Sequence, residues 1–473
     1  MQNTSRRIVK NTGVMLLGDG INNLLYFFIV IYLVRYLGES GFGKYSFVLV
    51  YISFFNFLTY IGINKIIVRE ISKNNAINEK IIGNALTIRL FLSILSIILS
   101  FIIINLLNYP YDTKILVYIA SISLFSSSLS ATYSSIFQTY LKMEYSMVAN
   151  LVERIISSIL ILLIILLKGS IVYIIIAIVI SNFFNLFVTC LFSRKFVKPV
   201  FEFEFYYAKQ ILTSSIPIGI TAAFRVIYYR IDVIMISLMK TESDIGYYAS
   251  AYTLISPLNL IPSALMFSVF PLMSRSSKKK ERYIEIYEKS FRVMLIIALP
   301  IAVITTFFSD HIIYLIYGNN FLPSAPALSI LVWSVVFMFM NIIFGNVIVS
   351  MNKQIITAYT SCIMAIVNII LNYFVIPQYN FIGASITTVI TEALGTTMLF
   401  WYIYTKLIKK TFITTILKLV LLNITLYIFL TIFNYIPIYL LVILSMIFYI
   451  FLLIVSKCIT KEEIKLLKSS IRL

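Results

Sequence analysis

The feature that most constrains this chain is a succession of apolar runs, each about as long as a lipid bilayer is thick. A helix needs about 20 residues to cross a hydrocarbon core of roughly 30 Å. At that length the sequence predicts about fourteen membrane spans. They lie near residues 12–34, 45–63, 82–107, 115–138, 146–167, 171–193, 211–239, 245–273, 288–308, 325–350, 354–376, 382–404, 411–433 and 437–456. The fold class is therefore predicted to be an all-α polytopic membrane protein.

Composition and charge agree with this prediction. With 60% hydrophobic and only 12% charged residues, the 473-residue chain has too little polar surface to cover a water-soluble core. If the N-terminus lies inside, the predicted cytoplasmic segments hold 27 Lys and Arg residues and the outer loops hold five. This bias predicts that both termini are cytoplasmic. The net charge of +19 is thus a signal of topology, and we expect no nucleic-acid partner.

A short polar segment is written twice in the sequence. "ESGFGKY" at residues 39–45 and "ESDIGYY" at residues 242–248 share four identities at matching positions. Both fall in predicted outer turns, where we expect the glycine and tyrosine to shape the turn and anchor it at the membrane interface. Because an even number of spans separates them, the two segments would have the same orientation in the membrane. We interpret the match as the result of a duplication within the chain. Chance similarity is the alternative.

The duplication predicts two pseudo-symmetric lobes of six helices each. Residues 1–193 form the predicted N-terminal lobe with spans 1 to 6, and residues 211–404 form the C-terminal lobe with spans 7 to 12. Residues 194–210 are the predicted cytoplasmic linker between them. Residues 405–473 hold two further C-terminal helices, spans 13 and 14, and an amphipathic cytoplasmic tail.

Polar side chains within the spans mark a candidate cavity, because a charge at the membrane centre costs at least roughly 2.5 kcal/mol. Arg225 lies near the middle of span 7, about 10 Å along the helix axis from Asp232, which is too far for a direct ion pair. Arg225 is therefore expected to line a cavity and bind an anion. The alternative is a buried ion pair with a residue of another helix. Glu392 in span 12 has the same two interpretations, cavity lining or a buried interhelical pair. The candidate substrate-binding residues are Arg225, Arg89, Arg154, Arg230, Tyr229, Tyr228, Asn368 and Asn372, and the candidate ion-coupling residues are Asp19, Asp232, Glu392 and Glu153.

The sequence offers little that suggests catalysis. It has no glycine-rich phosphate-binding loop, and its single histidine, His311, falls in a predicted outer loop. The three cysteines fall in or beside spans without a spacing that suggests pairing or metal binding. We therefore expect no metal, no cofactor and no catalytic residues, and a passage through the membrane instead of an enzyme.

Several segments resemble one known family. "YLVRYLGESGFGKYSFVLVY", "NKIIVREIS" and "NIILNYFVIPQYNFIGASITTVITEAL" look like the Wzx-type polysaccharide flippases of the multidrug/oligosaccharidyl-lipid/polysaccharide exporter superfamily. The most specific part is Asp232 followed by Gly246 and Tyr247 and then by a helix that ends in Phe270 and Pro271. The resemblance runs from span 1 through span 12 and implies a two-lobed fold like that of MATE transporters, working by alternating access.

The resemblance also implies a substrate. It is an undecaprenyl-pyrophosphate-linked oligosaccharide, flipped from the cytoplasmic to the outer leaflet of a bacterial inner membrane for O-antigen or capsular and exopolysaccharide biosynthesis. A polysaccharide polymerase or chain-length regulator would be the protein partner, with membrane lipid around the chain. Arg225, Arg89 and Arg154 would attract the pyrophosphate, since guanidinium suits phosphate. Tyrosines such as Tyr228, Tyr229 and Tyr26 would stack on sugar rings.

Two alternatives remain open. A cation-coupled drug exporter of the same fold would need an acidic cavity, which Asp19, Asp232 and Glu392 permit but the arginines within spans disfavour. A membrane polymerase or ligase for the same glycans belongs to a different class of protein. The short outer loops count against it.

Overall fold

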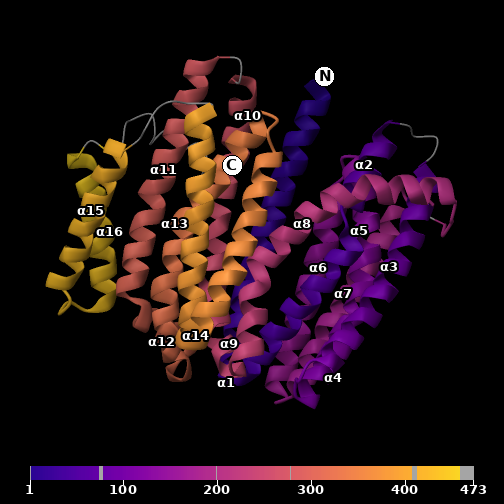
Figure 1. Ribbon diagram of the computed structural model, residues 1–473, viewed down its shortest axis with the longest axis horizontal. Coiled ribbons are helices and arrows are strands. Elements are labelled where there is room, and N and C mark those ends of the chain that lie inside the picture. The colour runs from indigo at the N-terminus through magenta and orange to yellow at the C-terminus, as the bar shows by residue number, and fades with distance from the viewer. Residues whose placement is uncertain are drawn as a thin grey trace. The chain divides into compact units, whose positions relative to one another are not determined.

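The computed structural model describes residues 2–73, 78–198, 200–276, 279–406, 413–456 and 458. These residues form helices joined by short turns, and none of them lies in a β-strand (Figure 1). The chain divides into two compact units, Met1–Gly246 and Tyr247–Leu473. The two six-helix lobes with a linker at residues 194–210 stay a prediction.

The first unit is built from eight helices and the beginning of a ninth. They are α1 (Gln2–Tyr60), α2 (Ile63–Lys73), α3 (Asn78–Leu106), α4 (Tyr111–Ser121), α5 (Ser123–Thr139), α6 (Glu144–Leu166), α7 (Ile171–Ser193), α8 (Phe205–Met239) and the first turn of α9 (Glu242–Ile255). Helix α8 packs against α1, α2 and α3. For that reason it belongs to the first unit.

The second unit contains the rest of α9 and all the helices that follow it. They are η2 (Ser256–Asn259), α10 (Leu260–Ser276), α11 (Lys280–Phe307), α12 (Ser309–Tyr317), η3 (Asn319–Ser324), α13 (Ala325–Ser350), α14 (Ile355–Lys406), α15 (Ile413–Ile432) and α16 (Ile438–Val455). Helix α13 packs against α10, α11 and α14 and is buried along most of its length. Helices α15 and α16 lie side by side at the margin of this unit, where α15 packs on α11 (Figure 1).

The predicted number of spans agrees with the helices. Eleven helical stretches among the described residues are long and apolar enough to cross a membrane, and α8 adds a twelfth as a bent pair of helices. Two of the eleven each hold two predicted spans around a break, at Gly38 (φ 66°, ψ −177°) in α1 and at Asn380 (φ 51°, ψ −140°) in α14. Counted in this way, the polytopic all-α fold with about fourteen spans is confirmed. The predicted amphipathic tail after residue 458 lies outside the described residues.

Proline accounts for the shape of α8. The helix bends by 43° between its parts Phe205–Ile220 and Ala222–Met239. Pro217 lies just before the bend, and it has no N–H to bond the carbonyl one turn earlier while its ring crowds that turn. The bend separates the part of α8 that carries Arg225 and Arg230 from the part that precedes it.

The repeated segments are helical and lie in contact with each other, so their prediction as turns is wrong. Residues 39–45 follow the break at Gly38, and residues 242–248 open α9. A Cβ on Gly43 would overlap the carbonyl of Glu242, and a Cβ on Gly246 would overlap the carbonyl of Glu39. The two glycines therefore allow one close helix crossing in which matching residues of the repeat make matching contacts. Tyr45 and Tyr248 are buried and do not anchor the segments at a surface.

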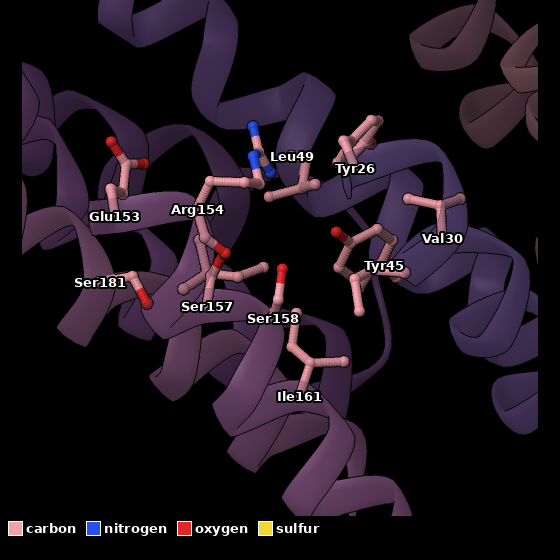
Figure 2. Close-up of a pocket in the computed structure, with 12 residues that line it drawn as sticks. Tyr26, Val30, Tyr45, Leu49, Glu153, Arg154, Ser157, Ser158, Ile161 and Ser181 are labelled. Atoms are coloured by element: carbon pink, nitrogen blue, oxygen red, sulfur yellow. The ribbon is translucent and has the colours of Figure 1, made fainter. Parts of the chain in front are cut away.

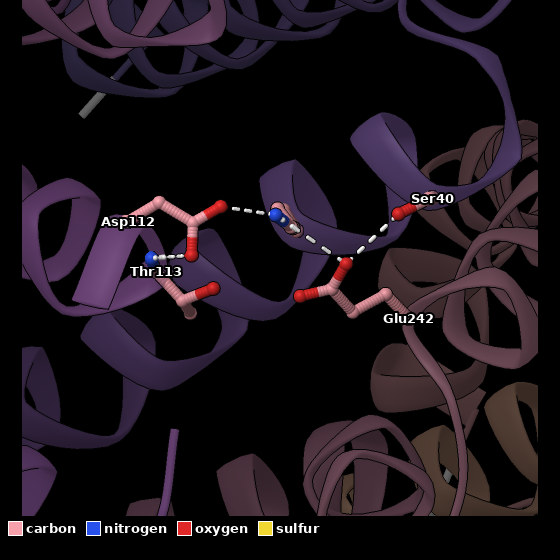
Figure 3. A network of polar contacts seen from close by, with 5 residues as sticks. Ser40, Asp112, Thr113 and Glu242 are labelled. Atoms are coloured by element: carbon pink, nitrogen blue, oxygen red, sulfur yellow. Dashed lines mark hydrogen bonds and ion pairs between the residues drawn. The ribbon is translucent and has the colours of Figure 1, made fainter. Parts of the chain in front are cut away.

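A polar network surrounds this crossing (Figure 3). The Ser40 hydroxyl donates to Oε2 of Glu242 at 2.8 Å, and the Lys44 ammonium lies 3.4 Å from the same oxygen. Lys44 also donates to the carboxylate of Asp112, which in turn accepts from the backbone N–H of Thr113 at 2.8 Å. The network thus joins α1, α4 and the first turn of α9 within the first unit.

Candidate functional site

A cavity of about 280 Å³ lies within the first unit, between α1, α6 and α7 (Figure 2). Polar and aromatic side chains share its wall with aliphatic ones. The lining residues are Tyr26, Ile29, Val30, Tyr45 and Leu49 of α1, Glu153, Arg154, Ser157, Ser158 and Ile161 of α6, and Ile178 and Ser181 of α7. Two of the predicted site residues, Glu153 and Arg154, are therefore brought together here.

An arginine lies against a tyrosine at this cavity. The Arg154 guanidinium carbon lies 4.9 Å from the centroid of the Tyr26 ring, close enough for a cation–π interaction. Arg230 of α8 also acts electrostatically on the Tyr26 hydroxyl, together with Arg154. Among the lining residues, Arg154 is the one cation and Glu153 the one carboxylate. The lining alone is thus balanced in formal charge, and Arg230 adds a further positive charge from α8.

Glu153 borders a cluster of buried polar side chains. Its carboxylate interacts with the side chain of Asn185 on α7. The Asn185 side-chain N–H donates to Oδ1 of Asn150 on α6 at 3.0 Å, and Asn185 Oδ1 accepts from the Ser130 hydroxyl of α5. The Ser130 and Thr189 hydroxyls lie 3.2 Å apart. This cluster ties α5, α6 and α7 together and holds the helix face that presents Glu153 and Arg154.

Two adjacent serines of α6 differ in their hydrogen bonds. The Ser157 hydroxyl donates to the carbonyl of Arg154 at 2.9 Å. The Ser158 side chain is 9% exposed and points into the cavity, and its hydroxyl has no hydrogen-bond partner among the described residues (Figure 2). Sequence reasoning missed Tyr45, Ser157 and Ser158, because hydroxyl side chains are common in membrane helices.

Arg89 lies elsewhere and is fully buried. Its guanidinium donates to the carbonyl of Ser128 at 2.8 Å and to the side chain of Asn64, and its carbon lies 5.3 Å from the Tyr60 ring centroid. These contacts join α3 to α5, to α2 and to the end of α1. The structure therefore places Arg89 among packing contacts and not in the cavity wall.

The remaining candidates on α8 divide into exposed and buried side chains. Arg225, Tyr229 and Arg230 are exposed, whereas Tyr228 and Asp232 are buried. The Tyr228 and Tyr229 rings lie edge to face with centroids 5.0 Å apart. Arg225 is free of ion pairs within the described part of the chain. The side chain of Asp19 lies outside those that the structure describes.

The candidates of the second unit form two buried hydrogen-bonded groups. The Asn372 side-chain N–H donates to Oδ1 of Asn368 at 3.0 Å, and the Thr387 hydroxyl donates to Oδ1 of Asn372. Glu392 accepts a 2.6 Å hydrogen bond at Oε2 from the side chain of Asn341 on α13. The first group joins the two parts of α14 on either side of its break at Asn380, and the second joins α14 to α13. Nowhere in the described ranges do three or more His, Cys, Asp or Glu residues gather in a way that could hold a metal ion.

Family models match most of the chain. The model described as "Polysaccharide biosynthesis protein" matches residues 8–277, more than half of the sequence, and the MatE model matches residues 217–374. Among individual proteins, the "Putative O-antigen transporter" of Shigella flexneri is 24% identical over 85% of this chain and 98% of its own length. The "Probable low-salt glycan biosynthesis flippase Agl15" of Haloferax volcanii is 26% identical over 36% of this chain, a match that spans only 37% of that protein.

A solved structure shares the fold. The "Lipid II flippase MurJ, inward closed conformation" superimposes with a TM-score of 0.78 at 17% identity, covering 93% of this chain and 96% of its own. At that identity the likeness shows the fold alone. The helical arrangement described above is thus that of known membrane transporters, as the sequence predicts.

Proposed function

Because the chain belongs to the polysaccharide biosynthesis protein family, we propose that it flips an undecaprenyl-pyrophosphate-linked oligosaccharide from the cytoplasmic to the outer leaflet of a bacterial inner membrane. The family relatives are named as a transporter and a flippase, and the fold is one of transporters, so the activity is transport and not catalysis. Alternating access is the proposed mechanism. The flipped units would then enter O-antigen or capsular polysaccharide.

The observation that carries this proposal is Arg154 in the cavity wall of the first unit, with Arg230 acting on the same tyrosine from α8. An arginine within a membrane span is costly, and such residues are retained where they meet a substrate or a partner. Arg154 lies against Tyr26 in the cavity wall, Arg230 acts electrostatically on the same tyrosine from α8, and Glu153 is the single lining carboxylate. A pyrophosphate supplies the negative charge that this arrangement lacks, and guanidinium groups bind phosphate oxygens through paired hydrogen bonds.

Arg225 is the proposed first contact for the pyrophosphate. It is exposed on α8, on the same side of the bend as Arg230. An exposed guanidinium within a span keeps its donors available for an incoming anion, whereas those of Arg89 are used in packing. The bias of Lys and Arg toward one set of loops supports cytoplasmic termini, and hence loading of the substrate from the cytoplasm.

The proposal is tested with the purified chain in vesicles. The probe is a fluorescent undecaprenyl-pyrophosphate-linked trisaccharide, and a membrane-impermeant quencher reports how much probe lies in each leaflet. We expect rapid equilibration with the wild-type protein and at least a tenfold loss of rate with Arg225→Ala, because about 1.5–3 kcal/mol is lost with a hydrogen bond to a charged group. Wild-type vesicles that leave the probe in place while moving a cationic dye down an ion gradient would instead identify a drug exporter.

A further inference from the structure

We propose that the cavity lined by Tyr26, Arg154 and Ser158 is a subsite for one sugar ring that carries an anionic group. This inference rests on the proposed function and adds to it the part of the substrate that this cavity selects. The flippase would thereby discriminate among oligosaccharides by a single sugar residue, and the other sugars would lie outside the cavity.

The size of the cavity sets how much of a glycan it can hold. At about 280 Å³ it is slightly smaller than the roughly 300–1,000 Å³ pockets that enclose drug-sized ligands. A cavity of this volume accommodates one hydroxylated ring, but it has no room for a repeat unit of several sugars. Its aliphatic and aromatic wall, which includes Val30, Leu49 and Ile161, offers the surface against which the C–H faces of a sugar pack.

The polar groups of the cavity match the hydroxyls of a sugar. A buried hydroxyl without a hydrogen bond is energetically unfavourable, and the Ser158 hydroxyl is in this state. A sugar hydroxyl can both donate to Ser158 and accept from it. Glu153 adds carboxylate oxygens that accept hydrogen bonds from further hydroxyls. A purely apolar ligand would leave the Ser158 hydroxyl unsatisfied.

The charge of the cavity favours a ring with an anion attached. The Arg154 guanidinium carbon lies 4.9 Å from the Tyr26 ring centroid in the cavity wall, Arg230 acts electrostatically on the same tyrosine from α8, and Glu153 is the single lining carboxylate. The anion can come from two sources with the same chemistry. One is the carboxylate of an acidic sugar, and the other is the pyrophosphate next to the first sugar of the lipid-linked chain.

The test compares two probes and two positions on α6. The probes are fluorescent undecaprenyl-pyrophosphate-linked trisaccharides that differ only in the terminal sugar, a neutral hexose in one and a uronic acid in the other. Ser158→Leu fills the cavity, and Ser158→Ala removes only the hydroxyl. The matched control is Ser146→Ala, because Ser146 is on the same helix, is 8% exposed and also has a hydroxyl without a partner, but does not line the cavity.

We expect Ser158→Leu to slow flipping about tenfold, since a lost buried hydrogen bond and a filled cavity together remove more than 1.4 kcal/mol. Ser158→Ala should have a smaller effect in the same direction, and it is the deciding variant if Ser158→Leu does not elute as a monodisperse protein. Ser146→Ala should leave the rates within about twofold of wild type, because the hydroxyl that it removes makes no hydrogen bond.

Each outcome separates the inference from the function on which it rests. Slowing of only the uronic-acid probe identifies an acidic sugar as the occupant, and equal slowing of both probes identifies the sugar next to the pyrophosphate. Wild-type flipping of both probes with unchanged rates in the Ser158 variants would overturn the subsite and leave the proposed function intact. A wild-type protein that flips neither probe would overturn both.

Discussion

Two arginines of the first unit show how one residue type takes different roles according to its neighbours. Arg89 is fully buried with its donors on Ser128 and Asn64, whereas Arg154 lies in the cavity wall against Tyr26. Both lie near one end of their span, so the sequence alone cannot tell them apart. The difference arises because α2 and α5 pack around α3 and supply partners to Arg89.

The buried Arg89 and the exposed Arg225 predict different effects of alanine substitution. Arg89→Ala should lower the melting temperature in detergent, because it removes a buried side chain and leaves two acceptors without their donor, each hydrogen bond to a charge contributing about 1.5–3 kcal/mol. Arg225→Ala, at an exposed position, should leave the melting temperature unchanged while slowing flipping at least tenfold. Thermal unfolding and vesicle flipping measured side by side decide the matter. An unchanged melting temperature for the Arg89→Ala protein would contradict the role of Arg89 in packing.

The candidate site could be predicted from the sequence only where it is charged. Glu153 and Arg154 stand out because ionisable side chains are rare in membrane helices. Tyr45 and Ser158 do not stand out, since their role depends on α1, α6 and α7 enclosing a cavity between them. Asn150 and Asn185 were likewise missed, although an asparagine within a span is a usable signal of interhelical hydrogen bonding.

At the scale of elements, the crossing of α1 and α9 is the closest contact that the repeat produces. Gly43 and Gly246 each face backbone atoms of the opposite helix, so the contact depends on the absence of a side chain. The sequence revealed the repeat but not the contact. Sequence similarity between two segments does not show that they are in contact in the fold.

Alanine at either glycine tests this crossing. Gly43→Ala and Gly246→Ala should each destabilise the protein, because a Cβ would force the backbones apart in a packed contact. Gly345→Ala is the control, since its Cβ would meet nothing within 4 Å and alanine favours a helix by roughly 0.5–1 kcal/mol over glycine. Melting temperatures in detergent measure all three. Equal melting temperatures for the three variants would contradict the close crossing.

Across the whole molecule, the number of spans could be predicted because each needs an apolar run long enough to cross a bilayer. The boundary between the two compact units could not be predicted in this way. The boundary falls at Gly246 because α8 packs on α1, α2 and α3. The hydropathy of the sequence does not show which helices pack together. The breaks at Gly38 and Asn380 turn one continuous helix into two spans, and only the length of the apolar run signals them.

The orientation of the whole chain remains a prediction that cysteine labelling can check. On a background without Cys190, Cys362 and Cys458, a cysteine in place of Lys168 should react with a membrane-impermeant maleimide in intact cells. A cysteine in place of Lys353, which is also exposed, should react only after the membrane is permeabilised. The reverse pattern would place both termini outside and overturn loading from the cytoplasm.

The reciprocal glycine contact also constrains how this chain can evolve. Where two side chains meet, a change in one can be compensated by a change in the other. At positions 43 and 246 each glycine meets the opposite backbone, which every amino acid carries, so no substitution on the partner helix makes room. Across related sequences these two positions should therefore stay glycine independently of each other, and they should show no covariation even though they lie in contact.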